Sequence, residues 1–205
     1  MTSLTALFTA PALALALLST TPVFADSQPA IAGTEVIVEN LPEDKRTTPG
    51  LYITAAEAAG ALATREDVLL IDVRSPEETM LVGYATATDA NIPFAMIDPD
   101  LTFDPKKDAY KMSPDPAFAD NVKAWLATPA AEGATALLVM CRSGTRSAKA
   151  VNALAEAGIE LPIYSVVDGF EGDKDGNGVR NVNGWKNAGA EWTYKVTPDL
   201  WPRNQ

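Results

Sequence analysis

Short apolar runs that alternate with helix patterns constrain the fold of this chain more than any other feature. Residues 68–73 and 134–140 are apolar almost throughout, which is the pattern of strands buried on both faces of a parallel sheet. Helices are predicted over 54–63, 115–127 and 145–157, and shorter strands over 91–94 and 163–167. Strands that alternate with helices predict an α/β fold built on an open parallel sheet.

The amino-acid composition excludes several classes of site. The 205 residues carry a net charge of −11 and include one cysteine and no histidine. Without histidine there is no Ser-His-Asp or Cys-His catalysis and no imidazole zinc site. A single cysteine excludes an intrachain disulfide and a cysteine-rich metal cluster, and the acidic balance argues against binding to nucleic acid phosphates. We therefore expect no metal, no cofactor and no nucleic-acid partner.

The N-terminal residues have the pattern of a secretory signal peptide. Residues 4–18 are almost wholly apolar, the first charged side chain is Asp26, and Val23 and Ala25 are the small residues before a cleavage point. A buried helix and a retained membrane anchor are the alternatives, although the apolar stretch is shorter than the ~20 residues that span a bilayer. We expect residues 1–25 to be removed and the mature protein to be periplasmic or secreted, away from the membrane.

Cys141 lies directly between a predicted strand and a predicted helix. The connecting sequence is Cys141-Arg142-Ser143-Gly144-Thr145-Arg146-Ser147. Ligands of open parallel sheets bind beyond the carboxyl ends of the strands, where this loop should lie. Its backbone N–H groups can turn inward at the positive end of a helix dipole, and Arg142 and Arg146 add positive charge. These features favour the thiolate and predict an anion site; the alternative is a buried, inert cysteine.

Asp72 and Arg74 end the other long apolar run, which should lie beside the strand that precedes Cys141. We expect these two residues to form a buried ion pair that supports the cysteine loop. A direct role in substrate binding is the alternative. Trp125 is expected in the core. The later tryptophans, Trp185, Trp192 and Trp201, are expected to pack from the C-terminal segment, with a part in binding a second substrate as the alternative.

At these residues the sequence resembles the rhodanese-like family, over roughly residues 54–194. The resemblance rests on Leu70-Ile71-Asp72-Val73-Arg74, Gly83 through Asn91-Ile92-Pro93, the Cys141 loop, Val167-Asp168-Gly169-Phe170-Glu171-Gly172, and Gly184-Trp185 with Gly189. The loop pattern Cys-x-x-Gly-x-Arg is the most specific of these marks. The resemblance implies a single rhodanese-like domain over 51–197, with helices on both faces of the sheet. A polar arm over 26–50, with at most one short strand at 36–38, precedes it, and a tail over 198–205 follows.

The resemblance implies a sulfurtransferase that forms a persulfide on Cys141. The thiolate would take a sulfane sulfur from a small anionic donor such as thiosulfate. It would pass that sulfur to cyanide, to a thiol, or to an exported acceptor protein. Backbone amides from Arg142 to Ser147 would stabilise the persulfide, and Arg146, with Arg142, would bind the anionic part of the donor. No base is needed if the thiol is already ionised.

Two other functions compete with this hypothesis. Cysteine-dependent phosphatases and arsenate reductases use a similar loop with one more residue between cysteine and arginine, whereas Cys141 and Arg146 are separated by four residues. The resemblance associates the shorter spacing with sulfur transfer. A non-catalytic rhodanese-like binding module is the second alternative, although such modules commonly lose the cysteine.

An insertion over 173–183 departs from the family pattern. Its first residues, 173–178, have the oxygen ligands of the first half of a calcium loop. Position 12 of such a loop would be Gly184 and not glutamate, so a solvated turn rich in Asp, Asn and Gly is favoured. The insertion is expected to reshape one wall of the site.

Overall fold

The computed structural model describes residues 1, 31 and 36–201 of the chain. The predicted signal peptide after Met1, most of the arm before residue 36, and the last residues of the tail lie outside the described residues. Among the described residues, no helix combines the length and the apolar character needed to cross a membrane.

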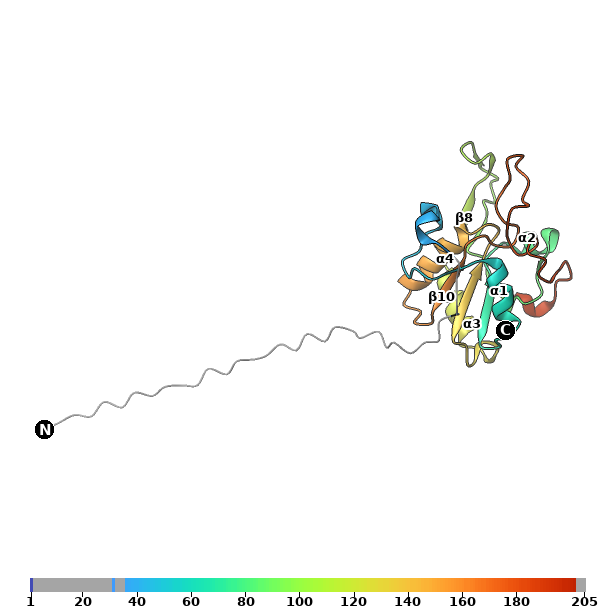
Figure 1. The fold of residues 1–205 in the computed structure, drawn as a ribbon. Helices are drawn as coiled ribbons and strands as arrows, with labels where there is room; N and C mark the ends of the chain where they lie inside the picture. The colour runs from blue at the N-terminus through green and yellow to red at the C-terminus, as the bar shows by residue number, and fades with distance from the viewer. Residues whose placement is uncertain (2–30, 32–35, 202–205) are drawn as a thin grey trace.

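The core of the protein is a five-stranded parallel sheet in the order β1-β10-β9-β2-β4 (Figure 1). The strands are β1 (Tyr52–Ile53), β2 (Val68–Asp72), β4 (Ala90–Asn91), β9 (Ala136–Met140) and β10 (Ile163–Val166). The two long apolar runs pair with each other, from Val68 opposite Ala136 to Asp72 opposite Met140. Every residue of β2 and β9 is buried, because a parallel sheet of this kind is covered on both faces. The predicted open parallel α/β sheet is confirmed.

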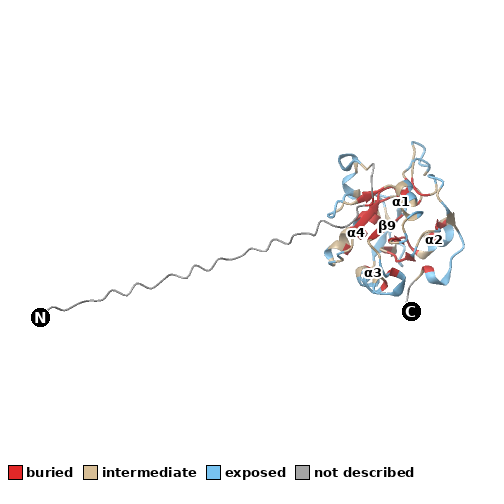
Figure 2. Cartoon of the chain, turned by 60° about the horizontal axis from the view of Figure 1, so that its bottom comes forward, coloured by how far each residue is buried: buried red, intermediate tan, exposed pale blue. Residues whose placement is uncertain are grey.

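Helices cover both faces of the sheet, as the resemblance implied. On one face, α3 (Phe118–Leu126) and α4 (Thr145–Glu156) contribute Phe118, Val122 and Leu154 to a core that includes Ile71 and Val139. On the other face, α1 (Ala55–Leu62) packs with buried residues of the C-terminal segment. Trp125 is buried in the first core and Trp185 in the second. Figure 2 shows the buried residues gathered along the strands, between the helices.

Capping residues set where the first two helices begin. Thr54 accepts a hydrogen bond from the Glu57 amide, and the Glu57 side chain returns one to the Thr54 amide, the capping box expected from the sequence. The same exchange between Ser75 and Glu78 begins α2 (Pro76–Val82), a helix that the sequence analysis did not predict. This second box places Glu78 on the first turn of α2.

The arm and the edge strand differ from the prediction. Residues 36–38 form no strand; the described part of the arm holds two 3₁₀ turns, η1 (Val38–Asn40) and η2 (Glu43–Lys45). Ile37 and Val38 remain exposed, and no neighbouring strand in the described chain supplies a ladder for them. The strand predicted over 91–94 begins at Ala90 and ends before Pro93, since proline has no N–H for the ladder.

Several short two-stranded pieces were not predicted, because each is too short to show a hydrophobic period. They are β3 (Tyr84–Ala85) with β11 (Trp192–Thr193), β5 (Ala95–Ile97) with β8 (Met112–Pro114), and β6 (Phe103–Asp104) with β7 (Ala109–Tyr110). Two 3₁₀ turns, η3 (Pro129–Ala131) and η4 (Pro198–Leu200), complete the described elements. The hairpin over 95–114 and the insertion over 173–183 project from the same end of the molecule (Figure 1).

Candidate active site

Cys141 follows β9 directly, at the carboxyl end of the central strand of the sheet. It is a free cysteine with 1% of its surface exposed, and its Sγ accepts a hydrogen bond from the Gly144 amide at 3.2 Å.

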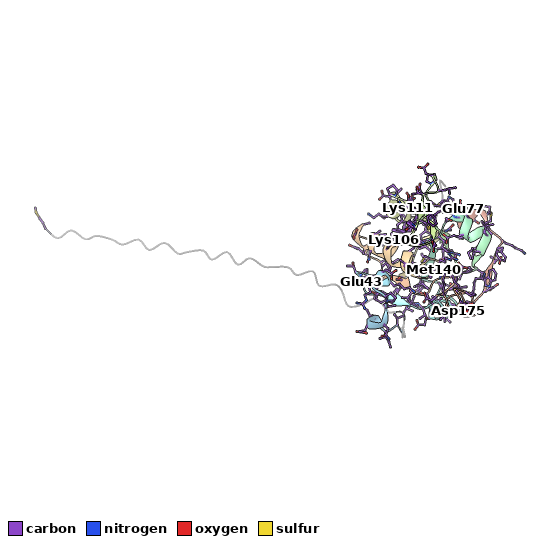
Figure 3. The ribbon with its side chains drawn as sticks, turned by 90° about the horizontal axis from the view of Figure 1, so that it is seen from above. Glu43, Glu77, Lys106, Lys111, Met140 and Asp175 are labelled. Atoms are coloured by element: carbon purple, nitrogen blue, oxygen red, sulfur yellow. The ribbon has the colours of Figure 1, made fainter. Side chains whose placement is uncertain are left out.

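Figure 3 looks down on this end of the molecule, where Met140, the last residue of β9, lies near the middle. Around it in this view are Glu43 of the arm, Glu77 of α2, Lys106 and Lys111 of the hairpin, and Asp175 of the insertion.

The backbone of the cysteine loop offers unpaired hydrogen-bond donors. Gly144, at the N-terminal cap of α4, has a φ of 100°, so the chain turns sharply into the helix. Five loop residues have amide N–H groups without an acceptor in the described part of the chain: Arg142, Ser143, Thr145, Arg146 and Ser147. Unpaired amides at the positive end of a helix dipole form a favourable place for an anion.

The turn after β10 supports the loop from outside. The Phe170 amide donates to the Cys141 carbonyl at 2.8 Å, and the Glu171 amide donates to the Arg142 carbonyl at 2.9 Å. Gly169 has a φ of 64°, and a Cβ on this residue would lie 2.6 Å from both the Cys141 carbonyl oxygen and the Ser143 nitrogen. Only glycine fits this contact, which explains the Asp-Gly-Phe sequence that contributed to the resemblance.

Arg146 is held by a glutamate that the sequence analysis missed. Its Nη1 and Nη2 donate to the two carboxylate oxygens of Glu78, each at 2.6 Å. Burial works to raise the pKa of Glu78, but the hydrogen bonds and charge of Arg146 outweigh burial and hold that pKa below its usual value. Burial likewise works to lower the pKa of Arg146, and Glu78 raises it overall, with a further contribution from Cys141. Arg146 therefore lies within electrostatic range of the thiol while its charge is balanced by Glu78.

Arg142 also has a carboxylate partner. Its Nε donates to Oε2 of Glu171 at 2.5 Å, and its side chain is 48% exposed. The pair joins the cysteine loop to the turn after β10. Each of the two guanidinium groups is thus bonded to a carboxylate. The donor-binding roles predicted for Arg142 and Arg146 remain predictions.

The strand end beneath the loop carries the third ion pair. Asp72 and Arg74 have side chains with 0% exposure, and Arg74 Nη2 lies 2.6 Å from Asp72 Oδ2. Arg74 also donates to the Gly83 carbonyl at 2.8 Å, and its guanidinium lies 4.2 Å from the centre of the Phe170 ring. Burial works to lower the pKa of Arg74, and the charge and hydrogen bonds of Asp72 outweigh burial and raise it. The expected ion pair is present, and it touches the turn that supports the cysteine loop.

The remaining loop side chains have different surroundings. Thr145 Oγ1 donates to Asp44 Oδ2 of the arm at 3.0 Å. Ser147 is fully buried, and its hydroxyl has no hydrogen-bond partner among the described residues. Ser143 is half-buried. The arm therefore reaches the cysteine loop, which the sequence analysis did not foresee.

The start of the insertion forms a hydrogen-bonded turn, and the preference for a solvated turn over a calcium loop stays a prediction. The Asp175 carboxylate accepts hydrogen bonds from the amides of Asn177 and Val179, each at 2.9 Å. Asp173 pairs with Lys45 Nζ of the arm at 2.8 Å. In the described part of the chain, no cluster of three or more His, Cys, Asp or Glu side chains has the arrangement of metal ligands.

A separate cavity of about 970 Å³ lies between β4, α3 and η4. Among the described residues, its walls include Asp89, Asp115 and Asp199 and contain no cysteine, lysine or arginine. Carboxylates without a basic neighbour in the wall repel an anion. An anionic substrate therefore fits the cysteine loop better than this cavity.

Comparisons with known proteins identify the family of the chain. Residues 54–175 match the rhodanese-like domain. The uncharacterized protein RP600 of Rickettsia prowazekii (strain Madrid E) is 28% identical over 142 residues, which cover 69% of this chain and 96% of that protein. The crystal structure of Rv0390 from M. tuberculosis aligns with a TM-score of 0.52 and 25% identity, over 70% of this chain and 96% of that one. With its family pattern matched over most of the sheet and the cysteine loop, the chain belongs to the rhodanese-like family.

Proposed function

We propose that the protein is a sulfurtransferase that carries a sulfane sulfur on Cys141. The observation that supports this most strongly is the position of the thiol: its Sγ accepts the Gly144 amide inside a loop with five further unpaired amides. This environment stabilises negative charge on sulfur before and after transfer. The site needs no histidine, because a thiolate is itself the nucleophile.

The proposed reaction has two displacement steps. The Cys141 thiolate attacks the outer sulfur of thiosulfate, a new S–S bond forms, and the old S–S bond breaks with its electron pair leaving on sulfite. The product on the enzyme is a persulfide anion. Cyanide or a thiolate then attacks the terminal sulfur, which leaves as thiocyanate or as a new persulfide, and Cys141 returns to the thiolate. Neither step requires a cofactor or an external oxidant.

The surrounding side chains hold this loop in place during both steps. Glu78 fixes Arg146 on the first turn of α4, and the Asp72–Arg74 pair braces the turn after β10 through Phe170. A preorganised loop holds its donors in fixed positions, among them the Gly144 amide that is bonded to the Cys141 sulfur. Arg74 is bonded to Asp72 and to the Gly83 carbonyl, so we assign the pair a supporting role.

The experiment that tests the proposal is sulfur loading. We expect thiosulfate to add the mass of one sulfur atom to the intact protein and cyanide to remove it as thiocyanate. The variant Cys141→Ser should gain no mass while keeping the circular dichroism of the wild type. A wild-type protein that gains no sulfur contradicts the proposal, and hydrolysis of an aryl phosphate or reduction of arsenate by Cys141 would favour the phosphatase or reductase alternative.

One observation favours a second candidate, a non-catalytic binding module. Cys141 is 1% exposed, which is also expected of an inert structural cysteine. The two candidates differ in thiol reactivity: a sulfurtransferase thiol reacts with iodoacetamide in the folded protein, and an inert one reacts only after unfolding. Alkylation in native buffer therefore separates them.

We also propose that the protein acts after export, on a small donor or an exported acceptor protein. The support is the apolar stretch over 4–18 and the small residues that precede Asp26. Sequencing the N-terminus of the protein recovered from the periplasm or medium should give Asp26 as the first residue. Recovery in the cytoplasm with Met1 intact would contradict export.

A further inference from the structure

The insertion over 173–183 is a closed loop with a fixed neck. At the neck, the Asp173 amide donates to Asn183 Oδ1 at 2.7 Å, and Asn183 Nδ2 donates to Asp173 Oδ2 at 3.1 Å. A Cβ on Gly172 would lie 1.8 Å from the Asn183 carbonyl oxygen, so only glycine permits the two chain segments to approach this closely. The Gly184 amide donates to buried Asp168 at 2.8 Å. The neck is thus anchored to the end of β10.

The loop beyond the neck is ordered by its own side chains. Asp175 accepts the amides of Asn177 and Val179 and, at 3.0 Å, the Asn181 side chain. Lys174 and Arg180 pair as an antiparallel bridge across the loop. These bonds hold the backbone of the loop at Val179 and Arg180, and the bond from Nη1 to the Gly172 carbonyl holds the Arg180 side chain.

The Arg180 side chain is bonded to the neck of the insertion, which is bonded in turn to the cysteine loop. Its Nη1 donates to the Gly172 carbonyl, and the Gly172 amide donates to the Arg142 carbonyl at 3.3 Å. The Nε of Arg180 is buried and has no hydrogen-bond partner in the described part of the chain. Burial and the nearby charge of Arg142 lower the pKa of Arg180, while Glu171, Asp173 and Cys141 act in the opposite direction. Arg180 therefore lies within electrostatic range of the thiol.

Arg180 differs from the two arginines of the cysteine loop in its partners. Arg146 is bidentate with Glu78, and Arg142 is bonded to Glu171. Arg180 forms no ion pair with a carboxylate among the described residues. Its charge is therefore the least neutralised of the three guanidinium charges near Cys141, and its buried Nε–H still lacks an acceptor, which costs free energy until a ligand supplies one.

We propose that Arg180, from the insertion, binds the sulfonate group of the anionic sulfur donor. This inference rests on the proposed function and names the residue that selects the donor. The guanidinium fork matches the oxygens of a sulfonate. As the S–S bond of the donor breaks and its electron pair moves to sulfite, negative charge on that group increases, and Arg180 stabilises it. The donor class is accordingly a thiosulfate-like anion with oxygens on its leaving sulfur.

The test compares two alkylating reagents that differ in charge and share one chemistry. Iodoacetate and iodoacetamide both form an S–C bond to Cys141 and release iodide, and only iodoacetate is an anion. Arg180→Gln should slow carboxymethylation by iodoacetate about 10- to 100-fold, the loss expected for a hydrogen-bonded charge. The same variant should leave the iodoacetamide rate within about twofold. Lys174→Gln is the matched control, because it removes a positive charge from the exposed side of the same loop.

Sulfur loading provides the second measurement. Arg180→Gln should raise the thiosulfate concentration needed for half-maximal loading by a similar factor. Arg180→Lys keeps the positive charge but lacks the paired N–H donors of the guanidinium. It should show a smaller loss than Arg180→Gln with both iodoacetate and thiosulfate. Sulfite should protect wild-type Cys141 from iodoacetamide, a test that needs no variant.

The outcomes separate this inference from the proposed function. An unchanged iodoacetate-to-iodoacetamide ratio in Arg180→Gln, or no protection by sulfite, overturns the role of Arg180. A wild-type protein that gains no sulfur but shows the Arg180-dependent preference for iodoacetate overturns the sulfurtransferase and keeps the anion site. An equal effect of Lys174→Gln would mean that loop charge in general, and not Arg180, attracts the anion.

Discussion

The strand end beneath the cysteine loop and the rim of that loop both carry acidic–basic pairs, and the pairs differ in burial. The side chains of Asp72 and Arg74 are 0% exposed, whereas those of Arg142 and Glu171 are 48% and 20% exposed. A buried charge that loses its partner is strongly destabilising, but water screens an exposed pair. The strand end therefore maintains the fold, while the rim, formed by the Arg142–Glu171 pair, can exchange partners with a ligand.

The largest effect is expected at the strand end. Asp72→Asn leaves Arg74 without a carboxylate in a fully buried position, and we expect a loss of roughly 3 to 5 kcal/mol in the free energy of unfolding. Urea denaturation followed by circular dichroism measures it. Asp67→Asn is the control, because it breaks the more exposed Arg65–Asp67 pair. Equal shifts in the two variants would show that burial does not distinguish these pairs.

Glu78→Gln should have an intermediate effect. The Glu78 and Arg146 side chains are 24% and 16% exposed, so solvent compensates part of the loss. We expect about 2 kcal/mol of destabilisation, the range for hydrogen bonds to charged groups. Because Arg146 lies on the first turn of α4, beside the cysteine loop, this variant should also slow sulfur loading by thiosulfate. Wild-type loading in a destabilised protein would mean that the pair serves only stability.

The effect of Glu78→Gln should depend on pH. The folded-state pKa of Glu78 is lowered, so its contribution to stability is present above the ordinary glutamate pKa of about 4.3 and is lost as the pH falls through the lower folded-state value. Urea denaturation of wild type and variant should therefore give a constant difference near neutrality and a shrinking one below about pH 4. Asp89 and Asp168, whose pKa values burial raises, are present in both proteins and cancel. If the difference in the free energy of unfolding between wild type and variant did not change with pH, the Glu78–Arg146 ion pair would be contradicted.

The smallest effect on stability is expected at the rim. Arg142→Gln should change the free energy of unfolding by less than about 1 kcal/mol, because water reaches the Arg142 side chain, which is 48% exposed, and screens its pair with Glu171. Thermal denaturation at low and high salt measures it, and added salt should reduce the difference further. A loss as large as that of Asp72→Asn would place the rim among the residues that maintain the fold.

The elements that could be predicted are those with a clear local pattern of apolar or capping residues. The continuous apolar runs specified β2 and β9, and the box from Thr54 to Glu57 specified the start of α1. The same kind of signal, Ser75 to Glu78 with Pro76, was present for α2, but no apolar period follows it. The short strands β3 and β11 exist only as partners of each other, so tertiary pairing and not local sequence determines them.

The site, too, has a part that the sequence predicts and a part that depends on tertiary contacts. Cys141 and its loop could be predicted because strand, loop and helix are continuous in sequence. Glu78 could not, because it reaches Arg146 from 68 residues away. Arg180 gave no signal, since its role depends on how the insertion folds back toward the cysteine loop.

The central claim is that Cys141 carries one transferable sulfur, and a single-turnover yield tests it most directly. The protein is loaded with thiosulfate, freed of excess donor and mixed with cyanide, and thiocyanate is counted per chain. We predict a yield approaching one in the wild type and none in Cys141→Ser. A folded wild-type protein that yields no thiocyanate, or a serine variant that yields as much, would contradict the claim.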